Sequence, residues 1–147
     1  MNLPTIAICN LISNTALLRK FALQHGFSGV DWTFRIEDIP RNRIDESRLL
    51  KNISLLNGLE VLYHCAFQGV DLGDEDDLRA YEAMKLLQKV CRVVSRLEGE
   101  FMTVHLGLGR QSPEGLSWER TTRSLSDLAD YAETPGAARS RPTCQDT

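Results

Sequence analysis

Short apolar runs alternate along this chain with longer segments whose apolar residues recur at helical spacing. The runs contain β-branched residues and lie at residues 5–11, 27–34, 61–67 and 101–106. Such runs predict strands, and the run at 101–106 is typical of a strand that is covered on both faces. Each run is followed by a segment long enough for a helix, so the pattern predicts four strand–helix units.

The intervening segments predict four amphipathic helices. The clearest spans about twenty residues, and its apolar positions recur at helical spacing: Leu78, Tyr81, Met84, Leu87, Val90, Cys91, Val94 and Leu97. The first helix begins after a cap at Ser13 or Asn14, with Leu17, Leu18, Phe21 and Ala22 as its buried stripe. The second begins near Asp45, and the fourth, which includes Trp118, begins after a cap at Ser117.

The remaining segments predict loops and a tail. The polar segment 35–43 contains Pro40, and the acidic segment 68–77 is expected to be a solvated turn rather than a calcium site. Residues 134–147 contain two prolines, a glycine and no large apolar residue, so we expect them to be disordered. The sequence therefore predicts an α/β domain at 1–133, with a parallel sheet and outer helices, followed by a tail at 134–147.

Composition narrows the classes of partner and the cellular setting. The formal net charge is −3, so no global positive field attracts the chain to nucleic acid, and we expect none as a partner. No apolar run approaches the roughly 20 residues of a membrane helix, and no signal peptide is evident. The cysteines are widely spaced, which favours reduced thiols and a cytoplasmic location.

Two histidines occupy equivalent places near the ends of two predicted strands. His64 lies within the run at 61–67, and His105 lies near the end of the run at 101–106. Because ligands bind at the carboxyl edge of a parallel sheet, both are candidates for binding substrate or metal. The alternative is a half-buried histidine that forms a hydrogen bond with a neighbouring loop.

Other side chains near strand ends have two interpretations each. Asn10 either donates a hydrogen bond to a substrate hydroxyl or stabilises a turn. Trp32, Phe34 and Phe67 either form an apolar wall for a sugar ring or belong to the core, and the core is favoured. The loop 107–110, Gly-Leu-Gly-Arg, either cradles a phosphate or is a flexible connection, and the connection is favoured.

Three stretches together resemble the xylose-isomerase-like TIM-barrel superfamily, which includes sugar isomerases, epimerases and endonuclease IV. They are Gly26-Phe27-Ser28-Gly29-Val30-Asp31, Tyr63-His64-Cys65 and Val104-His105-Leu106-Gly107. The resemblance implies a divalent metal (Mn²⁺, Mg²⁺, Co²⁺ or Zn²⁺) at the carboxyl ends of the strands and a sugar or sugar phosphate as substrate. His64 and His105 match family histidines that contact metal in the nucleases and usually line the sugar pocket in the isomerases. The family often has glutamate at the place of Asp31.

A complete barrel of this kind has about 250 residues. The chain therefore resembles the first half of a barrel, followed by a tail that a premature stop or a shifted reading frame after Glu133 would explain. The family's metal carboxylates and acid/base pair come mainly from the second half. We therefore assign no catalytic residue, and we expect no tight metal binding and no turnover by this chain alone.

Three functions follow from this resemblance. The first is a truncated sugar or sugar phosphate isomerase or epimerase. The second is a non-catalytic half-barrel that forms homodimers or aggregates through exposed strand edges. The third is a fragment of a metal-dependent nuclease, which the absence of a dense Lys/Arg cluster on the expected substrate face disfavours.

Overall fold

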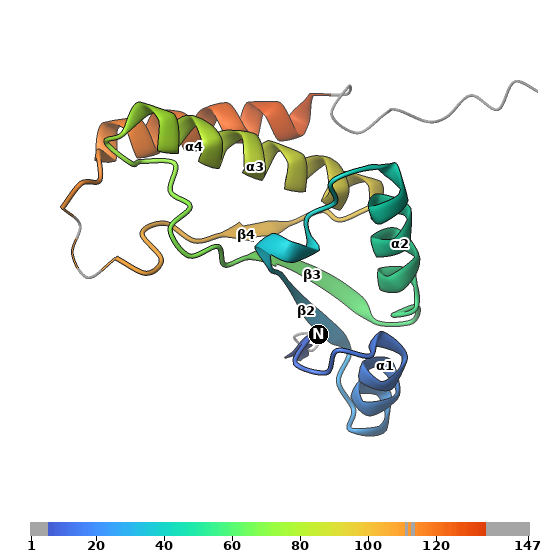
Figure 1. Cartoon of the computed structure of the whole chain (residues 1–147). Coiled ribbons are helices and arrows are strands. Elements are labelled where there is room, and N and C mark those ends of the chain that lie inside the picture. Colours follow the sequence, from blue (N-terminus) through green and yellow to red (C-terminus); the bar gives the residue numbers. More distant parts are fainter. Residues whose placement is uncertain (1–5, 111, 113, 135–147) are drawn as a thin grey trace, which may run out of the picture.

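The computed structural model describes residues 6–110, 112 and 114–134, and it has the expected α/β architecture. Strand and helix alternate four times along the chain (Figure 1). The elements are β1 (Ala7–Cys9), α1 (Thr15–Gln24), β2 (Gly29–Phe34), α2 (Arg43–Ser54), β3 (Glu60–Cys65), α3 (Asp77–Arg96), β4 (Met102–Val104) and α4 (Trp118–Glu133).

The four strands form one parallel sheet in the order β1-β2-β3-β4. Asp31 pairs with Cys9 on one side and with Leu62 on the other, and His64 lies between Thr33 and Thr103. Among the described residues, β1 and β4 are the edges of the sheet. This arrangement confirms the predicted half of a TIM barrel.

The two faces of the sheet differ in burial. Along β2, Val30, Trp32 and Phe34 are buried, whereas Asp31 and Thr33 between them are only partly buried. The buried set belongs to a core that includes Leu18 of α1, Ile53 of α2, Leu87 of α3 and Leu128 of α4. Since side chains alternate between the faces of a strand, the helices cover one face and leave Asp31, Thr33 and His64 on the other.

Side-chain caps set the helix starts. The Asn14 side chain accepts a hydrogen bond from the backbone N–H of Leu17, so Asn14 is the first cap rather than Ser13. Helix α2 begins at Arg43 rather than near Asp45, because the Asn42 side chain accepts from the N–H groups of both Ile44 and Asp45. The predicted loop at 35–43 also contains a short 3₁₀-helix, Ile36–Asp38.

Some apolar residues at helical spacing are exposed. Leu78 and Tyr81, at the start of α3, are 65% and 59% exposed. A twenty-residue helix is about 30 Å long, whereas a six-residue strand such as β3 spans about 20 Å. The amino end of α3 therefore extends past the strands that its middle covers (Figure 1). Leu17 and Phe21 of α1 and Trp118 of α4 are likewise exposed, so fewer apolar residues of these helices are buried than the helical spacing predicted.

Residues 135–147 of the predicted tail, which include Cys144, lie outside the described residues. Within the part of the chain that is described, no helix combines the length and apolarity needed to cross a membrane.

Candidate functional site at the carboxyl ends of the strands

The fold brings together the two histidines that the sequence singled out. His64 is the penultimate residue of β3, and His105 directly follows β4. Because Cys65 pairs with Val104 in the parallel register, the two histidines reach the same edge of the sheet. Their Nε2 atoms are 2.6 Å apart, and their rings stack with centroids 4.8 Å apart and an interplanar angle of 19°.

Asp31 completes this cluster from β2. Its Oδ2 lies 3.3 Å from Nδ1 of His64, and both side chains are partly exposed. If Nδ1 of His64 carries a proton for Asp31, Nε2 of His64 is the acceptor and Nε2–H of His105 is the donor. We call Asp31, His64 and His105 the histidine array.

Sequence reasoning included Asp31 in a motif but not among the site residues. The missing signal was the strand register, because Asp31 lies on the same face as Thr33, the residue that pairs with His64. Cys9 of β1 extends the array further, with its Sγ 4.0 Å from Oδ2 of Asp31 and its side chain exposed.

The array meets part of the requirement for a divalent metal. Imidazole nitrogens are common ligands of Zn²⁺ and related metals, and a carboxylate on the second ring nitrogen orients such a ligand. His64 and His105 therefore supply two side chains of this ligand type, and in the structure their Nε2 atoms contact each other at 2.6 Å. The described residues contain no group of three or more His, Cys, Asp or Glu side chains that would hold a metal by itself.

Asn10 connects two strand ends through its side-chain amide. Its Nδ2 donates to the carbonyl of Thr33 at 3.2 Å, and its Oδ1 accepts from the N–H of Thr33 at 2.9 Å. These bonds continue the pairing of β1 with β2 beyond Cys9. Asn10 thus bridges two strands, which neither interpretation from the sequence named, and its role in substrate binding stays a prediction.

The three aromatic candidates lie in the core. Trp32, Phe34 and Phe67 are 7%, 1% and 4% exposed, and Phe34 stacks on Tyr63 with ring centroids 5.9 Å apart. Trp32 and Phe34 point to the helical face of the sheet, opposite the histidine array. All three side chains are therefore part of the hydrophobic core, as the favoured interpretation of the sequence predicted. The indole Nε1 of Trp32 is buried without a hydrogen-bond partner among the described residues.

The acidic loop after β3 differs from its predicted solvated form. Asp71 and Asp74 are 4% and 7% exposed, because Arg110 from the loop after β4 forms ion pairs with both. Hydrogen bonds from the Asp76 backbone N–H and from Arg110 hold the pKa of Asp74 below its usual value, although burial opposes this shift. The guanidinium proposed for a phosphate is therefore already occupied by carboxylates.

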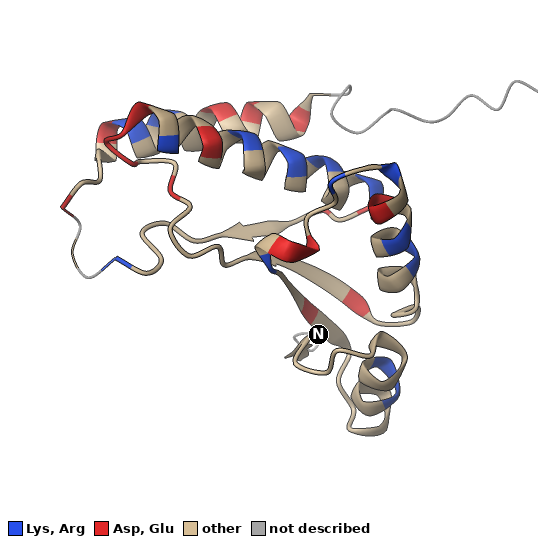
Figure 2. Ribbon diagram, viewed as in Figure 1, with Lys and Arg blue, Asp and Glu red and all other residues tan. Residues whose placement is uncertain are grey.

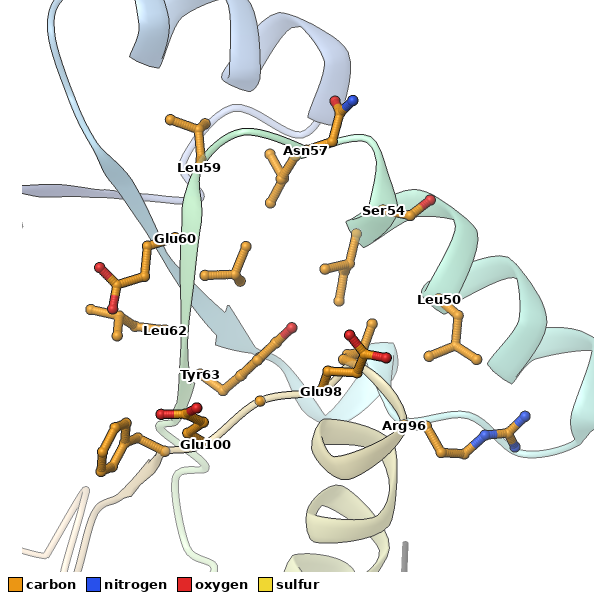
Figure 3. Close-up of a pocket in the computed structure, with 16 residues that line it drawn as sticks. Leu50, Ser54, Asn57, Leu59, Glu60, Leu62, Tyr63, Arg96, Glu98 and Glu100 are labelled. Carbon is orange, nitrogen blue, oxygen red and sulfur yellow. The ribbon is translucent and has the colours of Figure 1, made fainter. Parts of the chain in front are cut away.

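An open pocket of 790 Å³ lies away from the histidine array, near the amino end of β3 (Figure 3). Residues of α2, of β3 and of the segment 96–101 line it, and an ion pair between Arg96 and Glu46 links α3 to α2. Burial raises the pKa of Tyr63 in its wall to about 12. The pocket contains neither histidine, so we do not assign the candidate site to it.

Comparison with known proteins agrees with the fold. A family model described as Xylose isomerase-like TIM barrel matches residues 20–138. No curated protein and no solved structure matches the chain significantly. The matched segment includes β2, β3 and β4 with all three members of the histidine array. The chain therefore belongs to the xylose isomerase-like TIM-barrel family.

Proposed function

We propose that this chain supplies the first half of a metal-dependent site that isomerises or epimerises a sugar or sugar phosphate. The observation that carries the proposal is the histidine array, at the strand edge where parallel α/β folds bind ligands. Family membership supports it, because the family is generally metal-dependent and its fold is that of sugar isomerases, epimerases and endonuclease IV.

The residues of the array have separate roles in this proposal. His64 and His105 would hold the metal through Nε2 once these two atoms separate from their 2.6 Å contact, and Asp31, which accepts the Nδ1 proton of His64, leaves Nε2 of His64 as the ligand atom. When bound, the metal polarises the carbonyl and the neighbouring hydroxyl of the sugar. Nε2 of His105 can act as a ligand only in the tautomer that carries the ring proton on Nδ1, and a doubly protonated ring cannot bind at all, so metal binding should weaken in acid.

Proton transfer in this chemistry needs a further carboxylate as base. In the histidine array the carboxylate is Asp31, and its Oδ2 already lies against Nδ1 of His64. We therefore propose that the metal and acid/base groups of the full site come partly from outside the described residues, and that this chain alone has no turnover.

A sugar substrate is favoured over nucleic acid by the distribution of charge. The four strands contain no Lys or Arg, and the basic residues lie mainly along the helices (Figure 2). A nuclease face needs basic residues that neutralise phosphates.

A cytoplasmic setting is part of the same proposal. The free thiols of Cys9, Cys65 and Cys91 support it, because thiols stay reduced in the cytoplasm.

Metal titration with activity assays tests this proposal. Zn²⁺, Co²⁺, Mn²⁺ and Mg²⁺ are titrated by calorimetry into the wild type, His64→Ala, His105→Ala and the control His25→Ala. The His25 ring lies away from the array and packs at a tilt against Phe21 of α1. We expect weak binding that both array variants lose and the control keeps, without turnover of aldoses, ketoses or their phosphates. Binding that survives in His105→Ala would contradict the metal site. Turnover that disappears in His105→Ala would show that the site is complete.

Self-association is a second candidate function, favoured by the open edges of the sheet. The strands β1 and β4 have exposed apolar residues beside them: Ile6 is 62%, Leu11 is 89% and Phe101 is 72% exposed. Unpaired strand edges with apolar neighbours pair readily with another chain. We propose that two copies associate through these edges.

A further inference from the structure

The loops after β3 and β4 are joined by a buried carboxylate close to His105. Asp71, from the loop 66–76, is 4% exposed. Its Oδ2 accepts hydrogen bonds from the backbone N–H of Gly107 at 2.9 Å and from Nε of Arg110 at 3.2 Å. Its Oδ1 accepts from the N–H of Gly73 at 3.2 Å. One side chain thus fixes its own loop and the loop that follows His105.

Two further contacts join the loop after β3 to the loop after β4. The N–H of Gly69 donates to the carbonyl of Leu108 at 3.2 Å, and Arg110 also pairs with Asp74. Gly107 has a φ of +67°, which an L side chain rarely adopts. The chain therefore turns sharply two residues after His105, and the Asp71 carboxylate binds the backbone at that turn.

His105 itself has little other support. Strand β4 ends at Val104, and the described backbone bond of His105 is its N–H to the carbonyl of Cys65 at 3.3 Å. The backbone is therefore held at His105 by Cys65 and, two residues later, at Gly107 by Asp71. A shift of Gly107 would therefore move the His105 ring relative to His64, and the 2.6 Å contact between their Nε2 atoms is sensitive to such a shift.

We propose that Asp71 is a positioning residue that holds His105 in register with His64. It acts through the backbone N–H of Gly107, and Arg110 balances its buried charge. The consequence for metal binding rests on the proposed function, whereas the consequence for the geometry of the two imidazoles does not. A partner bonded directly to a metal ligand typically contributes 10–100-fold to metal affinity, and Asp71, which acts through the backbone of Gly107, should contribute no more than the lower end of that range.

The test compares Asp71→Ala and Asp71→Asn with the control Asp77→Ala, which removes an exposed carboxylate that pairs with Arg120 and does not contact Gly107. Imidazole ¹⁵N shifts and couplings report the tautomers and the contact between His64 and His105, and Zn²⁺ titration reports affinity. We expect Asp71→Ala to change the signals of both imidazoles and to weaken Zn²⁺ binding by up to about tenfold. Asp71→Asn, with one acceptor oxygen left, should show a smaller loss, and the control should match the wild type.

The outcomes separate the two proposals. If neither Asp71 variant changes the imidazole signals, the positioning role is wrong, even when thermal stability falls. If the wild type binds no Zn²⁺ but the imidazole signals change in Asp71→Ala, the metal site is wrong and the positioning role stands. Should Asp71→Ala fail to fold, Asp71→Asn alone decides by the same imidazole signals.

Discussion

At the scale of single residues, burial determines which side chains are chemically available. Cys65 and Cys91 are 1% and 9% exposed, and burial raises the pKa of the first thiol to about 12 and of the second to about 11. Cys9 is exposed beside the histidine array. The sequence shows only three similar cysteines in apolar surroundings, and the difference between them arises from the fold.

This difference predicts an alkaline loss of stability. An unfolded thiol has a pKa of about 8.5, so above that pH the unfolded chain loses protons that folded Cys65 and Cys91 keep. The free energy of unfolding should therefore fall from about pH 8.5 upward, through the folded pKa values of about 11 for Cys91 and about 12 for Cys65. We expect a smaller fall in the Cys65→Ala/Cys91→Ala double variant than in the control Cys9→Ser, measured by urea unfolding monitored by circular dichroism. Equal slopes in all variants would contradict this assignment.

At the scale of elements, each helix start depends on a particular side chain. The Asp76 carboxylate accepts hydrogen bonds from the N–H groups of Leu78 and Arg79 at 2.9 and 3.1 Å, and so caps α3, the longest helix described. The sequence presented Asp76 as one of several acidic residues in a row. Local geometry selects it, because only the residue that directly precedes the first turn can reach these two donors.

Loss of this cap should weaken the fold by a measurable amount. Asp76→Ala leaves the two N–H groups without their acceptor, and we expect the free energy of unfolding to fall by about 0.5–2 kcal/mol. Glu75→Ala is the matched control, because it removes a neighbouring acidic side chain outside the cap. Urea unfolding at neutral pH measures both variants. A control that loses as much stability as Asp76→Ala would show that general charge near the helix start matters, rather than the cap.

At the scale of the whole molecule, the open sheet carries a cost in folding free energy, because its edges are unpaired and one face is uncovered. A closed barrel has no strand edge, whereas here β1 and β4 are edges among the described strands. The face that bears the histidine array is also uncovered by the described helices. Exposed apolar surface costs about 25 cal/mol per Å², so several hundred Å² rivals the ~5–15 kcal/mol that stabilises a typical domain.

Association through the β4 edge follows from this balance. Thr103 is exposed on β4 and pairs with His64 in the register, so Thr103→Lys places a charge on the open face at the edge. We expect the wild type to dimerise or aggregate at micromolar concentration and the variant to do so less, as measured by multi-angle light scattering. Thr122→Lys, on the exposed side of α4, should behave like the wild type. A wild type that is monomeric at this concentration and unfolds cooperatively would contradict the expectation.

The sequence by itself determined the order of elements and the parallel sheet, and it marked His64 and His105 as candidates. The elements follow from local periodicity, and the two candidates follow from the rule that ligands bind at the carboxyl edge. Only the tertiary structure decided that Asp31 contacts His64, that Asn10 binds the backbone of Thr33, and that Asp71 and Arg110 form a buried pair. The physical reason is that each of these contacts joins residues at least 23 positions apart, and the register of neighbouring strands and loops, which local pattern does not encode, brings them together.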